Sequence, residues 1–224
     1  VFANLHGYLN NESPDSDHDY SAAMTEAHKE WRKPIISFEV GQYEVLPDFE
    51  QLKQYTGVTR PDNLLRVYKK ASLYGITPER WKKYVEASGE LAALCYREEI
   101  CAALRTDNLA GISLLSLQDF PGQGTALVGM MDSLMNVKPY PFAAPEKMRS
   151  VFNDTVLLIR TKKYVWRSIE NLEFRLQIAN FGAKDLCGEP LYSVIRDGKI
   201  VCQGRMAFTI SKKGNRSEAG KAVI

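Results

Sequence analysis

The sequence predicts an α/β region followed by an all-β region. Ile35–Phe38 and Gly111–Leu117 are short apolar runs bounded by proline or glycine, which is typical of buried parallel strands. Helical patterns separate these two runs, as in strand–helix–strand units. Beyond about Arg149, short strand-like runs alternate with turn signals, which predicts an antiparallel sandwich. The predicted regions are residues 1–145 and 146–224.

Composition excludes several classes of protein. The chain has 224 residues, of which 45% are hydrophobic and 25% charged, and its formal net charge is +2. This balance disfavours binding to nucleic acid or to an acidic membrane surface. No apolar run is long enough to span a bilayer. The chain begins with Val1 inside an apolar run, which indicates a piece of a longer polypeptide. A signal peptide removed upstream would direct the protein to the periplasm or the cell surface.

The four cysteines predict neither a zinc site nor a necessary disulfide. Cys95 and Cys101 are six residues apart in one helical pattern, on opposed faces, so they should not pair. Cys187 and Cys202 lie in the β-rich region and could meet, but four free thiols are favoured. No Cys-x-x-Cys spacing occurs. We therefore expect no metal and no cofactor.

The front half alternates strands and helices. An apolar run, Val1–Leu5, is followed by a polar loop and then by helical periodicity. Thr77-Pro78-Glu79 is a strong helix start, with a capping threonine and a proline at the first position. A break at Gly89 is one alternative for the helix that follows. The predicted helices are Tyr20–Arg32, about Glu50–Tyr55, Asn63 to about Tyr74, and Pro78 to about Arg105.

Each of the three front strands ends in a polar residue. The residues at these ends are His6, Glu39 and Asp119. Crossovers in such units are right-handed and make the strands parallel, so their carboxyl ends share one side. Gln42 and Gln118 should lie on the same side, next to these carboxyl ends. Three strands cannot close a barrel, which needs eight, so this half is either a small open α/β layer or the end of a truncated barrel.

The back half contains turn signals at regular spacing. Asp197-Gly198 between Ile195 and Ile200 is a two-residue hairpin signal. The predicted strands are Thr155–Ile159, Glu173–Ala179, Leu191–Ile195, Ile200–Cys202 and Met206–Ile210.

Three segments together resemble glycoside hydrolase family 2. Residues 33–42, Lys-Pro-Ile-Ile-Ser-Phe-Glu-Val-Gly-Gln, resemble the seventh-strand nucleophile segment of that family. Gly111 to Asp132, with Leu-Gln-Asp-Phe-Pro-Gly-Gln-Gly-Thr-Ala-Leu-Val-Gly, resembles the eighth strand and its loop in bacterial members that carry a sugar-binding domain. Ile178–Gly182 resembles part of the immunoglobulin-like sandwich that follows the barrel. The resemblance implies the last three units of a TIM (β/α)8 barrel and an immunoglobulin-like sandwich, both truncated.

The resemblance also implies a reaction. It makes Glu39 the nucleophile of a retaining glycosidase that cleaves terminal sugars, with the acid/base glutamate upstream of this chain. Gln42 or Tyr43 could donate a hydrogen bond that keeps Glu39 ionised. Asp119 would accept a hydrogen bond from a sugar hydroxyl. The other predicted substrate contacts are Gln42, Gln118, His6, Tyr8 and Tyr43, of which the two tyrosines would stack on a sugar face.

Two other readings stay open. The chain could be a non-catalytic carbohydrate-binding or structural module derived from a barrel enzyme, or a small α/β domain fused to a sandwich with an unrelated function. The enzyme reading predicts little or no activity for this fragment alone. Trp31 and Trp81 recur at helical spacing and are expected in the core, not at a sugar platform.

Overall fold

The computed structural model describes residues 2–3, 9, 17–115, 117–120 and 127–224. Its first part holds the elements β1 (Phe2–Ala3), α1 (Ser21–Glu30), β2 (Ile35–Gly41), the 3-10 helix η2 (Phe49–Gln54), α2 (Asp62–Leu73), α3 (Pro78–Arg105), β3 (Leu109–Leu115), the 3-10 helix η4 (Pro141–Ala143) and α4 (Pro145–Arg149). Its second part holds the strands β4 (Thr155–Arg160), β5 (Glu173–Asn180), β6 (Leu186–Gly188), β7 (Leu191–Arg196), β8 (Lys199–Arg205), β9 (Thr209–Ser211) and β10 (Asn215–Val223).

A parallel sheet of order β1-β2-β3 organises the first part, with β2 in the middle. One of its faces packs on α3, where Ile112 and Leu114 join the core clusters around that helix. On the opposite face Phe38 is 44% exposed, and Ser113 is exposed too. Parallel sheets are normally covered on both faces. The mixed α/β class is confirmed, and the described strands of this sheet do not close into a barrel.

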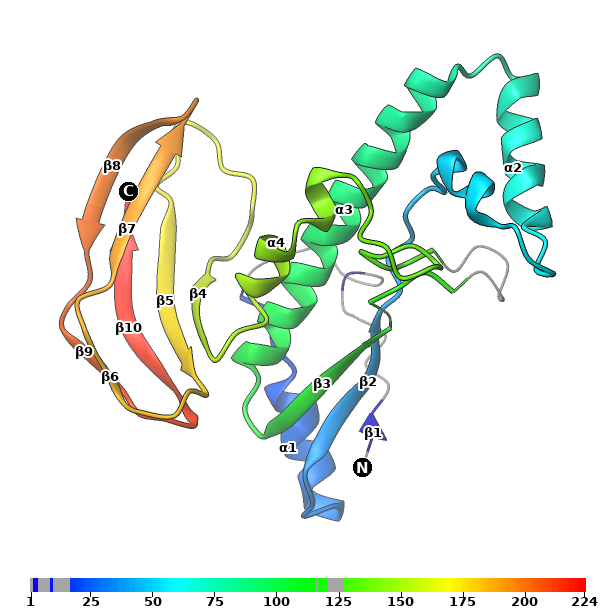
Figure 1. The fold of residues 1–224 in the computed structure, drawn as a ribbon. Helices are drawn as coiled ribbons and strands as arrows, with labels where there is room; N and C mark the ends of the chain where they lie inside the picture. Colours follow the sequence, from blue (N-terminus) through cyan, green and yellow to red (C-terminus); the bar gives the residue numbers. More distant parts are fainter. Residues whose placement is uncertain (1, 4–8, 10–16, 116, 121–126) are drawn as a thin grey trace.

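The long helix α3 lies between the parallel sheet and the antiparallel strands (Figure 1). Its predicted start is confirmed: the Thr77 side chain accepts a hydrogen bond from the Arg80 amide at 3.3 Å, and Pro78 is the first helical residue. The helix places Tyr96 in one buried cluster and Ile100 in another, which also contains Val156 and Leu158 of β4. These contacts pack both parts of the chain against one helix.

The break considered at Gly89 does not occur, since α3 is continuous from Pro78 to Arg105. The missing side chain at Gly89 leaves room for Phe142. A Cβ atom at position 89 would lie 2.2 Å from the Phe142 ring. That ring is fully buried and stacks on Tyr140, with centroids 5.4 Å apart. The glycine therefore serves a close approach between α3 and η4.

We predict that Gly89→Ala destabilises the protein by about 1–3 kcal/mol, because Phe142 must move out of a packed site. At an exposed helical position the same change would stabilise by about 1 kcal/mol. Gly57→Ala is the matched control, since open space surrounds that glycine. Urea unfolding of both variants measures the effect. A stabilised Gly89→Ala protein would contradict the packing argument.

The second part is a small all-β region. Its sheets are β10-β5-β4, β7-β8 and β6-β9, all antiparallel. The predicted hairpin is confirmed: Asp197 and Gly198 have φ of 51° and 74°, the positive values that a type I′ turn needs. Phe174, Leu176 and Ile178 of β5 form the core of this region. The antiparallel pairing of these strands agrees with the prediction for residues 146–224.

Several sequence expectations fail in detail. Trp31 was expected in the core but is 53% exposed, whereas Trp81 is half-buried and stacks on Phe49 at 4.7 Å. Met206–Ile210 was expected as one strand, but only its end belongs to β9. Strands β6 and β10 were not predicted. All four cysteines are free thiols, as expected.

Candidate functional site

Glu39 lies in a β-bulge near the carboxyl end of the middle strand. Between Ser37 and Val40 on β2 stand two residues, Phe38 and Glu39, while only Ser113 stands between their partners on β3. Glu39 has a φ of 58°, in the left-handed region. A residue other than glycine pays about 1–2 kcal/mol for that conformation. Bulges of this kind re-aim a side chain and are frequent beside active sites.

The Glu39 side chain is half-buried. None of the described residues donates a hydrogen bond to its carboxylate. The expected donor Tyr43 points elsewhere, and the Gln42 side chain is exposed. Gln42 is tied by its backbone instead, since its amide donates to the Leu115 carbonyl at 3.3 Å. This bond joins the ends of β2 and β3.

Tyr43 belongs to a buried polar cluster built around Glu99 of α3. The Glu99 side chain is 1% exposed and accepts hydrogen bonds from the hydroxyls of Tyr20 at 2.7 Å and Tyr43 at 2.9 Å. Burial and the negative Glu99 raise the pKa of Tyr43 well above its ordinary value. The prediction that Tyr43 holds Glu39 ionised is therefore wrong. Tyr43 instead anchors the segment after β2 to α3.

Tyr96 of α3 also contacts the end of β2. Its ring lies so close to Gly41 that a Cβ atom there would meet it at 2.2 Å. Its hydroxyl lies 2.9 Å from the carbonyls of Leu115 and Val128. Tyr96 thus links the carboxyl ends of β2 and β3, and the segment at Val128, to α3. This arrangement gives the end of β2 a rigid support.

We predict that Tyr43→Phe destabilises the protein by about 1–3 kcal/mol, because the buried Glu99 carboxylate loses a charged hydrogen bond. Tyr164→Phe is a comparison on a more exposed glutamate, Glu98, and should cost less. Thermal unfolding compares the two variants. Equal losses would show that burial of Glu99 does not set the cost.

Asp119 follows β3, as expected, but its carboxylate is used internally. Asp119 is 1% exposed, and its Oδ1 accepts hydrogen bonds from Lys138 Nζ at 2.9 Å and the Gly129 amide at 3.0 Å. Lys138 Nζ also donates to the Gly129 carbonyl at 2.7 Å. The expected contact with a sugar hydroxyl has no support in this placement, because a buried ion pair occupies the group. Through these bonds Asp119 holds the segment at Gly129 next to Gln118.

Burial dominates the electrostatics of this pair. It raises the pKa of Asp119 and lowers the pKa of Lys138, although each charge favours ionisation of the other. Desolvation of two charges commonly outweighs their attraction. Removing one partner of this pair should therefore cost more stability than removing one partner of a solvated surface bridge.

The parallel sheet brings the ends of β2 and β3 together, with Glu39 and Gln42 on one and Gln118 and Asp119 after the other. Gln118 is half-buried and pairs through its backbone with Met131. The predicted contacts His6 and Tyr8 lie outside the described residues.

Sequence reasoning missed Glu99 and Lys138. Glu99 carried a usable signal, since it falls on the apolar side of its helix, where an unpaired carboxylate is costly. Lys138 lies in a proline-rich connection, and nothing near it in the sequence indicates a buried partner.

In the part of the chain that the structure describes, no three His, Cys, Asp or Glu side chains are grouped to hold a metal ion. No helix there combines the length and apolarity that crossing a membrane requires. Comparison with protein-family models and with curated proteins finds no match for this chain.

Proposed function

We propose that this chain is the carboxyl-terminal portion of a retaining glycosidase with Glu39 as its nucleophile. The observation that carries the proposal is the left-handed bulge that holds Glu39 near the carboxyl end of the central parallel strand. Strained residues of this kind occur at functional sites more often than elsewhere. The carboxyl ends of parallel strands are also where α/β enzymes place their chemistry.

The open face of the sheet supports a larger fold. Phe38 and Ser113 are exposed on a side that parallel sheets normally bury. We propose that β1, β2 and β3 are neighbouring strands of a (β/α)8 barrel whose interior this face would line. The antiparallel strands after Thr155 would form an immunoglobulin-like sandwich. In that arrangement Glu39 stands at the barrel rim.

The chemistry needs two carboxyl groups about 5–5.5 Å apart. The Glu39 carboxylate would attack the anomeric carbon while the leaving oxygen takes a proton from an acid contributed by an earlier strand. A water then hydrolyses the glycosyl ester, and the same acid group acts as base. Gln42 is exposed and lies three residues after Glu39, and its backbone bond to Leu115 holds it at the same end of the sheet. Its side chain would contact the sugar.

Covalent trapping tests the proposal in the full-length protein. 2,4-Dinitrophenyl 2-deoxy-2-fluoroglycosides of the gluco, galacto and manno series are incubated with it, and the digest is analysed by mass spectrometry. We expect one label, an ester on the peptide that contains Glu39. A label on another carboxylate would overturn the nucleophile assignment. Failure to hydrolyse any aryl glycoside would favour the non-catalytic carbohydrate-binding module.

A further inference from the structure

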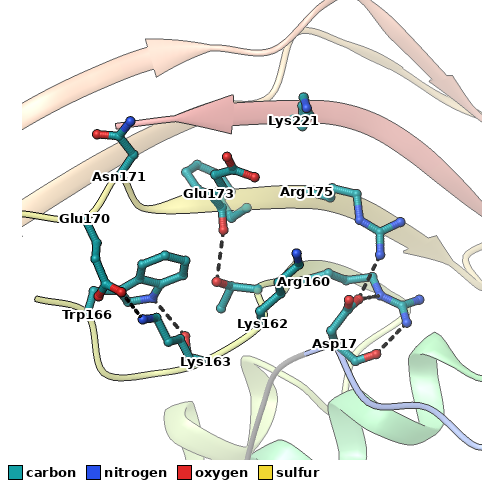
Figure 2. Close-up of a pocket in the computed structure, with 12 residues that line it drawn as sticks. Asp17, Arg160, Lys162, Lys163, Trp166, Glu170, Asn171, Glu173, Arg175 and Lys221 are labelled. Carbon is teal, nitrogen blue, oxygen red and sulfur yellow. Dashed lines mark hydrogen bonds and ion pairs between the residues drawn. The ribbon is translucent and has the colours of Figure 1, made fainter.

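A cavity of about 560 Å³ lies at the end of the antiparallel sheet, away from Glu39. The loop 161–172 forms one wall, β5 and β10 another, and Asp17 of the N-terminal segment closes one end (Figure 2). Its volume lies within the range of small-molecule sites. The side chains that line it include five cations: Arg160, Lys162, Lys163, Arg175 and Lys221.

Three of these cations form a row across neighbouring strands. Arg160 of β4 is the register partner of Arg175 on β5, and Arg175 is the partner of Lys221 on β10. Like charges directly opposite each other destabilise a sheet. Negative groups that lie against such a row offset this repulsion.

Acidic residues neutralise one side of the row. Asp17 Oδ1 accepts from Arg160 at 2.7 Å and from Arg175 at 2.8 Å, and Asp19 binds Arg160 at 2.7 Å. Burial alone would raise the pKa of Asp17, but the two guanidinium groups hold it below its ordinary value. The N-terminal segment therefore supplies the counter-charge at the β4 side.

The other side of the row keeps its positive charge. Within the described ranges, no carboxylate lies in ion-pair distance of Lys162 or Lys221, and both side chains are exposed. Lys163 is paired, with Glu170 at 2.6 Å. Glu173 of β5 also lines the cavity, diagonal to Lys221, but it is not within ion-pair distance of either lysine. The lining holds five cations and three carboxylates, Asp17, Glu170 and Glu173, so the cavity keeps a net positive charge.

An aromatic ring is held at the cavity wall. Trp166 Nε1 donates to the Lys163 carbonyl at 2.9 Å, and Lys163 Nζ lies 4.7 Å from the centre of the indole ring. Figure 2 shows Trp166 beside Lys163 and Glu170, with Asn171 nearby on the same wall. A fixed aromatic surface next to amide and ammonium donors suits a sugar ring, whose faces are apolar and whose edge is polar.

We propose that this cavity binds an acidic saccharide, with its carboxylate between Lys162 and Lys221 and its ring near Trp166. The choice of an anion rests on Lys162 and Lys221, for which the described residues offer no carboxylate within ion-pair distance. The choice of a saccharide rests on the proposed glycosidase function together with Trp166. The site would hold a substrate chain apart from the bond that is cleaved.

Isothermal titration of the full-length protein with trigalacturonic acid tests the proposal. We expect binding that weakens at least about tenfold in Lys162→Gln/Lys221→Gln, because both ammonium groups are lost. Lys199→Gln is the matched control, an exposed lysine on β8 outside the cavity. Unfolding curves of all variants establish that they are folded, and both lysines are exposed, so folding should be retained.

Further measurements test the anion site, sugar recognition and the proposed nucleophile separately. The methyl ester of trigalacturonic acid should bind at least about tenfold more weakly than the acid, and equal binding would overturn the anion site. Sodium sulfate that binds as tightly as trigalacturonate would overturn sugar recognition. Glu39→Gln should bind trigalacturonate as well as the wild type. Loss of hydrolysis in Glu39→Gln tests the nucleophile separately from this cavity.

Discussion

Glu39→Gln should lower kcat of the full-length protein on an aryl glycoside by at least about 10³-fold. The amide is nearly isosteric with the carboxylate but cannot form the glycosyl ester, so the covalent route is closed. Because the amide keeps the shape of the side chain and the same backbone, the left-handed conformation at φ 58° imposes the same cost. Stability should change by less than about 0.5 kcal/mol.

Glu44→Gln is the control for the Glu39 variant. Glu44 is an exposed glutamate in the loop after β2, five residues from the bulge, and its loss should leave kcat nearly unchanged. Steady-state rates with several aryl glycosides measure both variants. Wild-type activity in Glu39→Gln would end the assignment of Glu39 as nucleophile.

Lys138→Met should destabilise the protein by about 3–5 kcal/mol. The change removes one partner of a buried ion pair and leaves Asp119 uncompensated in the core. It also removes the donor to the Gly129 carbonyl. Lys147→Met is the matched control, because its bridge to Glu90 is exposed and should contribute at most about 1 kcal/mol. Urea unfolding compares the two variants.

The loss in Lys138→Met should depend on pH. Burial already raises the pKa of Asp119, and without Lys138 that pKa rises further. The folded state then holds a proton that the unfolded carboxyl releases near pH 4. Stability of the variant must therefore fall as pH rises above about 4. A larger loss at pH 8 than at pH 5 is expected, and an equal loss would contradict the role of the buried charge.

Local patterns predicted most elements well. The capping threonine and proline at 77–78 predicted the start of α3, because those residues satisfy the first helical amides locally. Asp197-Gly198 predicted its hairpin for a similar reason, since only such residues accept two successive positive φ values. Apolar runs also predicted β2 and β3.

Elements whose reasons are not local were missed. Strand β10 has the polar sequence Asn-Arg-Ser-Glu-Ala-Gly-Lys-Ala-Val, and it becomes a strand by pairing with β5. Gly89 looked like a weak point in a helix, but its function is to admit Phe142 from 53 residues further along the chain. Trp31 has helical spacing, but it lies just past the end of α1 and is 53% exposed.

The sequence by itself indicated that Glu39 lies near the carboxyl end of an apolar strand and that polar residues follow the neighbouring strand, although β2 continues past Glu39 to Gly41. Only the tertiary structure decided what those side chains do. Register with β3 creates the bulge at Glu39, α3 brings Glu99 to Tyr43, and Lys138 reaches back to Asp119. These outcomes depend on contacts between residues far apart in the chain. The pattern of neighbouring residues can mark a buried charge, as at Glu99, but it does not identify its partner. Periodicity reports which face of an element is apolar, whereas the partner of a buried charge is set by how the elements pack.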